Sequence, residues 1–380
     1  MSERTVLPAP YPRQMHDHLV RLSDELQFGR GFAADRATWE ARRPLVRQAL
    51  IDAVGGFPER TPLNAQVVGR IDRDGYHIEK VLYESRPGFH VTGALYVPHV
   101  DHAVPGVFCP HGHWAEGRYA PDVQRRMVGM ARRGYVVLTI DKVGYEDRQG
   151  QDHRTRATFL AGVATQGVQL WDNIRGLDYL CARPEVDSSR IGCTGCSGGG
   201  NQTMYLSALD ERITASAPVC SVEMGECYMH KLFCTCELVP GLRRFADLAD
   251  ICSLIAPRAL LLVHGLLDFG FLIDSARKVF LRIQKVYEAL RVPERLHHFT
   301  SYDTHAYNLE MREAVYAHFD RHLKGLEPPY APEGEVPIEE FADLRVLPEG
   351  LPEGARTMLT IYRELSDPLP PRPAVSDQVA

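Results

Sequence analysis

Apolar residues in the first part of the chain recur at every third or fourth position. This spacing is typical of one buried helix face and predicts two helices within residues 12–56. The first runs from Met15 to Leu26, and the second runs from Trp39 to Val54, where Gly55 and Gly56 end it. Pro44 lies inside the second segment, so we expect a kink or a break there.

The apolar pattern changes after residue 60. Residues 67–72, 77–83 and 91–97 are rich in β-branched residues and predict three strands. Asp74-Gly75 and Pro87-Gly88 separate them as tight turns. Because tight turns join neighbouring strands that run in opposite directions, we expect these strands to form an antiparallel edge.

Strands and helices then alternate as far as residue 323. The predicted strands are residues 107–109, 135–140, 191–194, 213–219, 260–263 and 296–300. The predicted helices are residues 122–133, 156–181, 203–209, 275–290 and 308–323. Short buried strands that alternate with helices indicate an α/β fold, in which a mostly parallel, doubly wound sheet is covered on both faces.

One long segment interrupts this alternation. Residues 220–257 are too many for a simple connection, and we expect them to form a cap-like insertion over the site. The sequence thus predicts a helical N-terminal extension at 1–60, an α/β domain at 61–325 and a proline-rich C-terminal extension at 326–380. Its tail, residues 368–380, is expected to be disordered.

Composition and charge exclude several classes of partner. The net charge is −6 and no segment is densely basic, so we expect no nucleic acid and no anionic membrane surface as partners. No apolar run reaches membrane-spanning length, and the N-terminus lacks a secretory pattern. Nine cysteines, an odd number, suit free thiols in a reducing compartment, so a cytoplasmic location is expected. The sequence leaves self-association into a homo-oligomer open.

Residues 195–199, Gly-Cys-Ser-Gly-Gly, contain the first candidate catalytic motif. This is a Gly-x-Ser-x-Gly pattern between a predicted strand and a predicted helix. Such a turn holds the serine hydroxyl of Ser197 exposed in a strained conformation. Glycines at 195 and 199 fit because a Cβ there would collide with neighbouring backbone. The pattern therefore predicts a nucleophilic serine.

A nucleophilic serine needs a base, and the base needs an orienting acid. Asp268 and His305 follow later strands of the alternating region, at ends where the functional groups of open α/β sheets gather. Their order, serine then acid then histidine, is the order of serine hydrolases built on such sheets. Glu223, after the strand at 213–219, is the rival acid.

A turn after the strand at 107–109 contains His111-Gly112-His113. Backbone N–H groups of His113 and Gly198 are the predicted pair of oxyanion donors. Alternate histidines also suit a metal, but no further ligands accompany them at zinc spacing, so we expect no metal and no organic cofactor. Four later cysteines resemble a metal cluster only loosely and are interpreted as free buried thiols: Cys220, Cys227, Cys234 and Cys236.

Six stretches together resemble the acetyl-xylan-esterase-like branch of the α/β-hydrolase superfamily, near the prolyl-oligopeptidase-type hydrolases. They are residues 61–98, 110–114, 134–145, 195–203, 256–268 and 305–323. The resemblance implies an α/β-hydrolase fold. It also implies Ser197 as the nucleophile, His305 as the base and Asp268 as its orienting acid.

The expected activity is cleavage of a carboxylic ester through an acyl-serine intermediate. The substrate is expected to be a small molecule or a sugar that carries a short acyl group such as acetyl. Hydrolysis of amide, peptide or C–C bonds on the same residues is the alternative. A binding protein without catalysis would not need the complete set of groups. The predicted walls of an apolar substrate pocket are Trp114, Tyr228, Met229 and Phe233.

Overall fold

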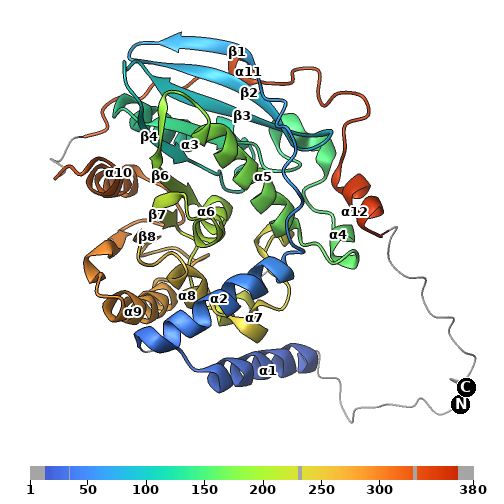
Figure 1. Ribbon diagram of the computed structural model, residues 1–380, viewed down its shortest axis with the longest axis vertical. Coiled ribbons are helices and arrows are strands. Elements are labelled where there is room, and N and C mark those ends of the chain that lie inside the picture. The colour runs from blue at the N-terminus through green and yellow to red at the C-terminus, as the bar shows by residue number, and fades with distance from the viewer. Residues whose placement is uncertain (1–12, 34, 230–232, 328–331, 367–380) are drawn as a thin grey trace, which may run out of the picture.

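The computed structural model describes residues 13–33, 35–229, 233–327 and 332–366. Nine strands of this part form one sheet in the order β1-β2-β3-β5-β4-β6-β7-β8-β9 (Figure 1). The strands are β1 (Gln66–Arg73), β2 (Tyr76–Arg86), β3 (Phe89–Pro98), β4 (Val104–Phe108), β5 (Val136–Ile140), β6 (Val186–Cys196), β7 (Ile213–Val219), β8 (Ala259–Gly265) and β9 (Leu296–Ser301).

The sheet is antiparallel at one edge and parallel elsewhere. β1, β2, β3 and β5 pair antiparallel, whereas the neighbours from β5 through β4 to β9 pair parallel. The predicted α/β-hydrolase fold, with a mostly parallel sheet and an antiparallel edge, is therefore confirmed. Because the parallel strands share one direction, their carboxyl ends lie at one edge, where the site is expected.

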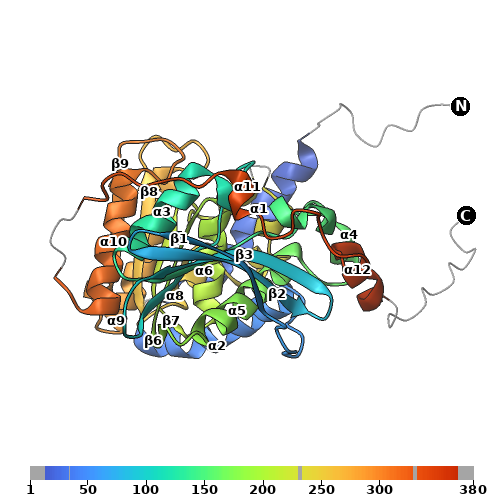
Figure 2. The same cartoon turned by 90° about the horizontal axis from the view of Figure 1, so that it is seen from above.

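Helices cover both faces of the sheet (Figure 2). Alternate side chains of β5 show why: Val136 and Leu138 join the hydrophobic cluster on one face, and Val137 joins the cluster on the other. The helices of the first face are α5 (Thr165–Cys181), α6 (Gly198–Leu209), α8 (Leu248–Ser253) and α9 (Ile273–Ala289), and those of the second are α3 (Pro121–Arg132) and α10 (Leu309–Lys324). No helix in the described residues is long and apolar enough to cross a membrane.

The two N-terminal helices are α1 (Gln14–Arg30) and α2 (Arg36–Ala53). Pro44 lies inside α2, which continues through it, so the predicted break does not occur. Asp35 caps α2 by accepting a hydrogen bond from the Thr38 N–H at 2.9 Å. Helix α1 contacts α7 (Leu242–Phe245) through Ser23, which accepts a 2.8 Å hydrogen bond from Arg243.

The single helix predicted for residues 156–181 is wrong. The segment forms α4 (Ala157–Leu160) and α5, and Gly162, with φ of +76°, lies between them. Left-handed backbone ends a helix. Val163 then packs with Met358 and Ile361, near the other end of the chain, so its apolar character reflects this contact rather than one continuous helix face.

The segment between β7 and β8 is the one predicted to form a cap-like insertion. Residues 220–257 follow β7 and contain the short helices η3 (Gly225–Met229) and η4 (Thr235–Glu237) before α7 and α8. Residues 230–232 lie outside the described part. The domain boundaries at 60 and 325 stay predictions.

The C-terminal residues 332–366 carry α11 (Phe341–Leu344) and α12 (Met358–Ser366). Leu344 of α11 joins the hydrophobic cluster of the second face, whereas α12 packs in a third cluster with Val163. Glu333 accepts two hydrogen bonds from the Arg312 guanidinium, at 2.7 and 2.6 Å. Asp147 accepts hydrogen bonds from the Val346 N–H at 2.8 Å and from Arg345 at 3.1 Å. This segment therefore supplies partners to charged groups of the catalytic domain. The tail predicted to be disordered, residues 368–380, lies outside the described residues.

Candidate active site

Ser197 stands at the turn between β6 and α6, as the sequence predicts. Its backbone has φ of +59° and ψ of −126°, a strained conformation for a residue with a side chain. The Ser197 N–H donates to the Val219 carbonyl at 2.9 Å, which fixes the turn on the neighbouring strand. This is the geometry of a nucleophile elbow.

Two glycines let a second loop approach the elbow. A Cβ on Gly195 would lie 2.3 Å from the Pro110 carbonyl oxygen, and a Cβ on Gly199 would lie 2.2 Å from the same atom. The neighbour that excludes a side chain is therefore the loop after β4. Because that loop carries the predicted oxyanion donor, the glycines bring it against the serine.

Asp268 and His305 are in direct contact. The Asp268 Oδ2 lies 2.8 Å from the His305 Nδ1, and its Oδ1 accepts from the N–H groups of Gly270 and Phe271 at 2.7 and 3.0 Å. Burial raises the pKa of the Asp268 carboxyl, but these hydrogen bonds, that from His305 foremost, hold the pKa below its usual value. The ionised carboxylate keeps the proton of neutral His305 on Nδ1, so Nε2 can accept one.

The rival acid does not take this position. Glu223 is buried in the segment after β7, while the His305 Nδ1 bonds to Asp268. The geometry therefore favours Asp268.

The predicted oxyanion residues lie next to each other. A Cβ on Gly198 would lie 2.5 Å from the His113 Cε1 and 2.5 Å from the Lys142 Nζ. The Trp114 ring covers the loop at Gly112, where a Cβ would lie 1.8 Å from its Cζ3. Burial, followed by the charge of Lys142, lowers the pKa of His113 to about 4, so its ring is neutral at neutral pH.

His111 anchors the same loop from within the core. Its Nδ1 lies 2.9 Å from the Gly112 carbonyl, and its Nε2 accepts the Lys142 N–H at 3.1 Å. These partners place the proton on Nδ1 and occupy both ring nitrogens. The ring is therefore a structural tie, and neither nitrogen is left for a metal.

Lys142 is a functional candidate that the sequence analysis missed. Its Nζ is buried next to Gly198 and has no hydrogen-bond partner among the described residues. A buried ammonium beside an oxyanion position favours negative charge there. Its place directly after the carboxyl end of β5 is the signal that could have found it.

A row of aromatic rings leads from the insertion to the base. Tyr228 and Phe233 stack with centroids 4.0 Å apart, Phe233 lies 6.1 Å from Phe271, and Phe271 stacks on His305 at 5.6 Å. Two of the predicted pocket walls thus reach the site. The side chain of Met229 lies outside the described residues.

A cavity of about 570 Å³ opens beside the oxyanion loop. It is lined by His113, Tyr145, His153, Arg154, Arg156, Phe233, Cys234, Thr235 and Glu237. This lining is more polar than the apolar pocket predicted from the sequence, because charged side chains after η2 (Glu146–Gln151) and in η4 reach it.

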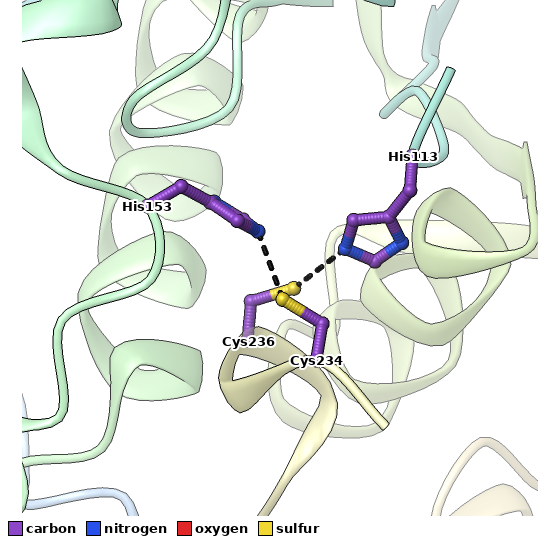
Figure 3. A group of neighbouring side chains, drawn as sticks. All are labelled: His113, His153, Cys234 and Cys236. Carbon is purple, nitrogen blue, oxygen red and sulfur yellow. Dashed lines mark hydrogen bonds between the residues drawn. The ribbon is translucent and has the colours of Figure 1, made fainter. Parts of the chain in front are cut away.

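The four cysteines that resembled a loose cluster separate into two groups. The Cys220 Sγ contacts the Ala306 carbonyl at 3.4 Å, and the Cys227 Sγ contacts the Ser275 Oγ at 3.2 Å. Cys234 and Cys236 instead lie with His113 and His153 (Figure 3). Sequence reasoning missed His153, which no pattern connected to the cysteines.

Glu146 is a buried acid beneath the oxyanion loop. Burial, followed by the charge of Asp141, raises the pKa of Glu146 to about 10, whereas the unfolded chain has the ordinary value. Between these values the unfolded chain releases a proton that the folded protein keeps, so stability falls as the pH rises. We expect Glu146→Gln to gain in urea midpoint over the parent protein between pH 5 and pH 8. The same difference in unfolding free energy at both pH values would contradict the raised pKa.

The elbow, the paired acid and base and the covered parallel sheet together define a serine hydrolase with the α/β-hydrolase fold. The prolyl oligopeptidase family matches residues 121–326, more than half of the chain. This chain belongs to the prolyl oligopeptidase family.

Comparisons with individual proteins agree. The chain is 27% identical to "Putative hydrolase YtaP" of Bacillus subtilis (strain 168) over 268 residues, 63% of this chain and 86% of that protein. The solved structure of "Methylesterase BT1017" is 26% identical, has a TM-score of 0.73 and covers 93% of this chain and 78% of its own.

A putative acetyl xylan esterase from Bacteroides fragilis NCTC 9343 shares the fold at 16% identity, with a TM-score of 0.62 over 78% of this chain and 84% of its own. The prediction of a serine ester hydrolase near the prolyl-oligopeptidase-type hydrolases is confirmed by the family match and the methylesterase structure. The acetyl xylan esterase structure supports the fold alone.

Proposed function

We propose that this protein hydrolyses a short-acyl carboxylic ester through an acyl-serine intermediate, with Ser197, His305 and Asp268 as its triad. The observation that carries the proposal is the 2.8 Å contact between Asp268 and His305 in a chain whose Ser197 occupies a strained elbow. A binding protein would need neither the strain nor the buried pair.

Each group has a role in the reaction. His305 Nε2 removes the proton of the Ser197 hydroxyl as its oxygen attacks the ester carbonyl, and Asp268 stabilises the resulting imidazolium. The tetrahedral oxyanion accepts hydrogen bonds from the N–H groups of Gly198 and His113, and the Lys142 ammonium adds positive charge. Collapse expels the alcohol, which takes the proton from His305. Water then attacks the acyl-serine in the same way and releases the acid.

The substrate is proposed to be a small or sugar-derived ester with an acyl group as short as acetyl. Rings of Tyr228, Phe233 and Phe271 beside His305 provide an apolar wall of limited length. Arginine and tyrosine side chains of the adjoining cavity provide donors for hydroxyl groups. The neighbour named as a methylesterase is likewise an ester hydrolase.

A panel of nitrophenyl esters and nitroanilides tests this proposal. We expect acetyl and propionyl esters to be cleaved faster than octanoyl esters, because each methylene that does not fit costs about 1–3 kcal/mol. Acetylated sugars and methyl esters of sugar acids extend the panel to both halves of the ester. A preference for octanoyl esters would contradict the short-acyl assignment.

The nitroanilides test the alternative of amide hydrolysis. An amide nitrogen must be protonated by His305 in good alignment before it leaves, whereas an alkoxide or phenoxide leaves more readily. We expect anilide cleavage to be barely detectable. Anilide rates that equal the ester rates would favour a peptidase.

A further inference from the structure

Four side chains with metal-binding atoms meet beside the oxyanion loop, and the triad uses none of them. His113 follows β4, and His153 follows η2. Cys234 directly precedes η4, and Cys236 lies within it. In Figure 3 both imidazoles point toward the two sulfur atoms. The His113 Nε2 lies 3.1 Å from the Cys236 Sγ, and the His153 Nε2 lies 3.1 Å from the Cys234 Sγ.

We propose that His113, His153, Cys234 and Cys236 form a structural zinc site that fastens the cap-like insertion to the oxyanion loop. The four donor atoms all lie within 4.8 Å of one another. Around tetrahedral zinc, with bonds of about 2.0 Å to nitrogen and 2.3 Å to sulfur, the N–S separation is about 3.5 Å and the S–S separation about 3.8 Å. The cluster therefore needs only small side-chain movements to hold the ion.

The orientation of His153 independently indicates a ligand. Its Nδ1 lies 2.8 Å from the Val143 carbonyl oxygen, which can only accept a hydrogen bond. The proton is thus on Nδ1, and the lone pair of Nε2 faces the sulfur atoms. Zinc-binding histidines are held in this way, with the second ring nitrogen donating to a backbone carbonyl or carboxylate.

The donor set selects the ion. Two thiolates and two neutral imidazoles balance the charge of a divalent ion, and this combination is typical of structural zinc sites. The protein supplies all four ligands, so no position stays open for a catalytic water. The ion would stabilise the fold without entering the ester chemistry.

Three other groups of metal-binding side chains in the described residues are less suitable. In the group of His111, Asp141 and Glu146, hydrogen bonds occupy both ring nitrogens of His111. In the group of Cys220, Asp268 and His305, the last two residues form the acid–base pair of the proposed triad. The group of Asp72, His77 and His99 offers three ligands, two of them exposed.

A zinc ion here would affect the oxyanion position through His113. The ring of His113 lies against Gly198, and its backbone N–H is the second proposed oxyanion donor. Holding this ring from the insertion side would restrict the backbone of the donor. Along the chain, His113 precedes Cys234 by 121 positions and Cys236 by 123 positions. The ion would therefore join segments that local structure does not connect.

Elemental analysis of the full chain is the direct test, on protein purified without a histidine tag and under reducing conditions. We expect about one zinc per chain, as one four-ligand site requires. The double variant Cys234→Ser/Cys236→Ser should lose the zinc, and the matched control Cys181→Ser, a half-buried thiol outside the cluster, should keep it. Protein with no zinc, or a double variant with undiminished zinc, would overturn the proposal.

Cobalt replacement provides a readout that does not depend on activity or on any variant. Zinc-free protein titrated with Co²⁺ should show the intense visible bands of tetrahedral cobalt and a near-ultraviolet thiolate-to-cobalt band. His153→Asn should weaken Co²⁺ binding at least tenfold, in the range known for metal-site perturbations. Absence of both bands in the parent protein would overturn the site.

Thiol titration excludes the competing explanation, a disulfide between Cys234 and Cys236. Denatured protein with a chelator should release all nine thiols of the chain. Seven thiols together with no bound zinc would show a disulfide instead. Because these measurements do not involve esters, a protein without zinc would leave the proposed esterase function unaffected. A protein that holds zinc but cleaves no ester would refute only the proposed esterase function.

Discussion

Ser197→Ala is expected to abolish ester hydrolysis while the protein stays folded. Removal of the nucleophile of a serine hydrolase lowers the rate by on the order of a million-fold, because the covalent path is lost and only residual catalysis by the oxyanion donors and substrate binding is left. The measurement is kcat/KM for a nitrophenyl acetate, with circular dichroism to show that the fold is unchanged.

A fluorophosphonate probe supplies a second readout for the same variant. The probe should label the parent protein and leave Ser197→Ala unlabelled. Full esterase activity in the folded variant, or labelling of another serine, would refute the assignment of the nucleophile.

Asp268→Asn should lower kcat by roughly ten-thousand-fold, the size of effect known for the corresponding change in a serine protease. The amide can donate a hydrogen bond to the His305 Nδ1, which stabilises the tautomer with its proton on Nε2. In that tautomer the Nε2 cannot accept the hydroxyl proton of Ser197. KM should change far less than kcat, because the carboxylate does not contact substrate in the proposed reaction.

Glu223→Gln is the matched control for this substitution. Glu223 is a buried acid near the same strand ends, but the His305 Nδ1 bonds to Asp268 instead. We expect a much smaller effect on kcat from Glu223→Gln. If the two variants ranked in the opposite order, the acid of the triad would be Glu223.

The sequence predicted the sheet and the placement of the triad for a common reason. Short apolar strands that alternate with helices must form a parallel sheet, and Ser197, Asp268 and His305 each follow one of its strands. The contact between Asp268 and His305 is therefore a consequence of topology. Local patterns were sufficient because each functional residue lies directly after an element that the pattern identifies.

The wrong helix prediction and the two missed residues all depend on contacts between segments that are distant in the sequence. Val163 continues an apolar spacing across Gly162, yet it packs against Met358 and Ile361, so periodicity alone predicted one helix too long. His153 follows a short 3₁₀ segment that has no apolar period, and its relation to Cys234 arises only in three dimensions. Lys142 likewise acquires its interest only from the position of Gly198.

The C-terminal segment has a consequence for where this enzyme can be divided. The family match ends at residue 326, but Glu333, beyond it, neutralises Arg312, whose side chain is only 6% exposed. Loss of one partner from such a buried pair costs about 3–5 kcal/mol, a large part of the 5–15 kcal/mol by which domains are stable. Asp147 would also lose the Val346 N–H. We therefore expect the smallest autonomous folding unit of this chain to extend at least to Val346, beyond the end that homology alone would give.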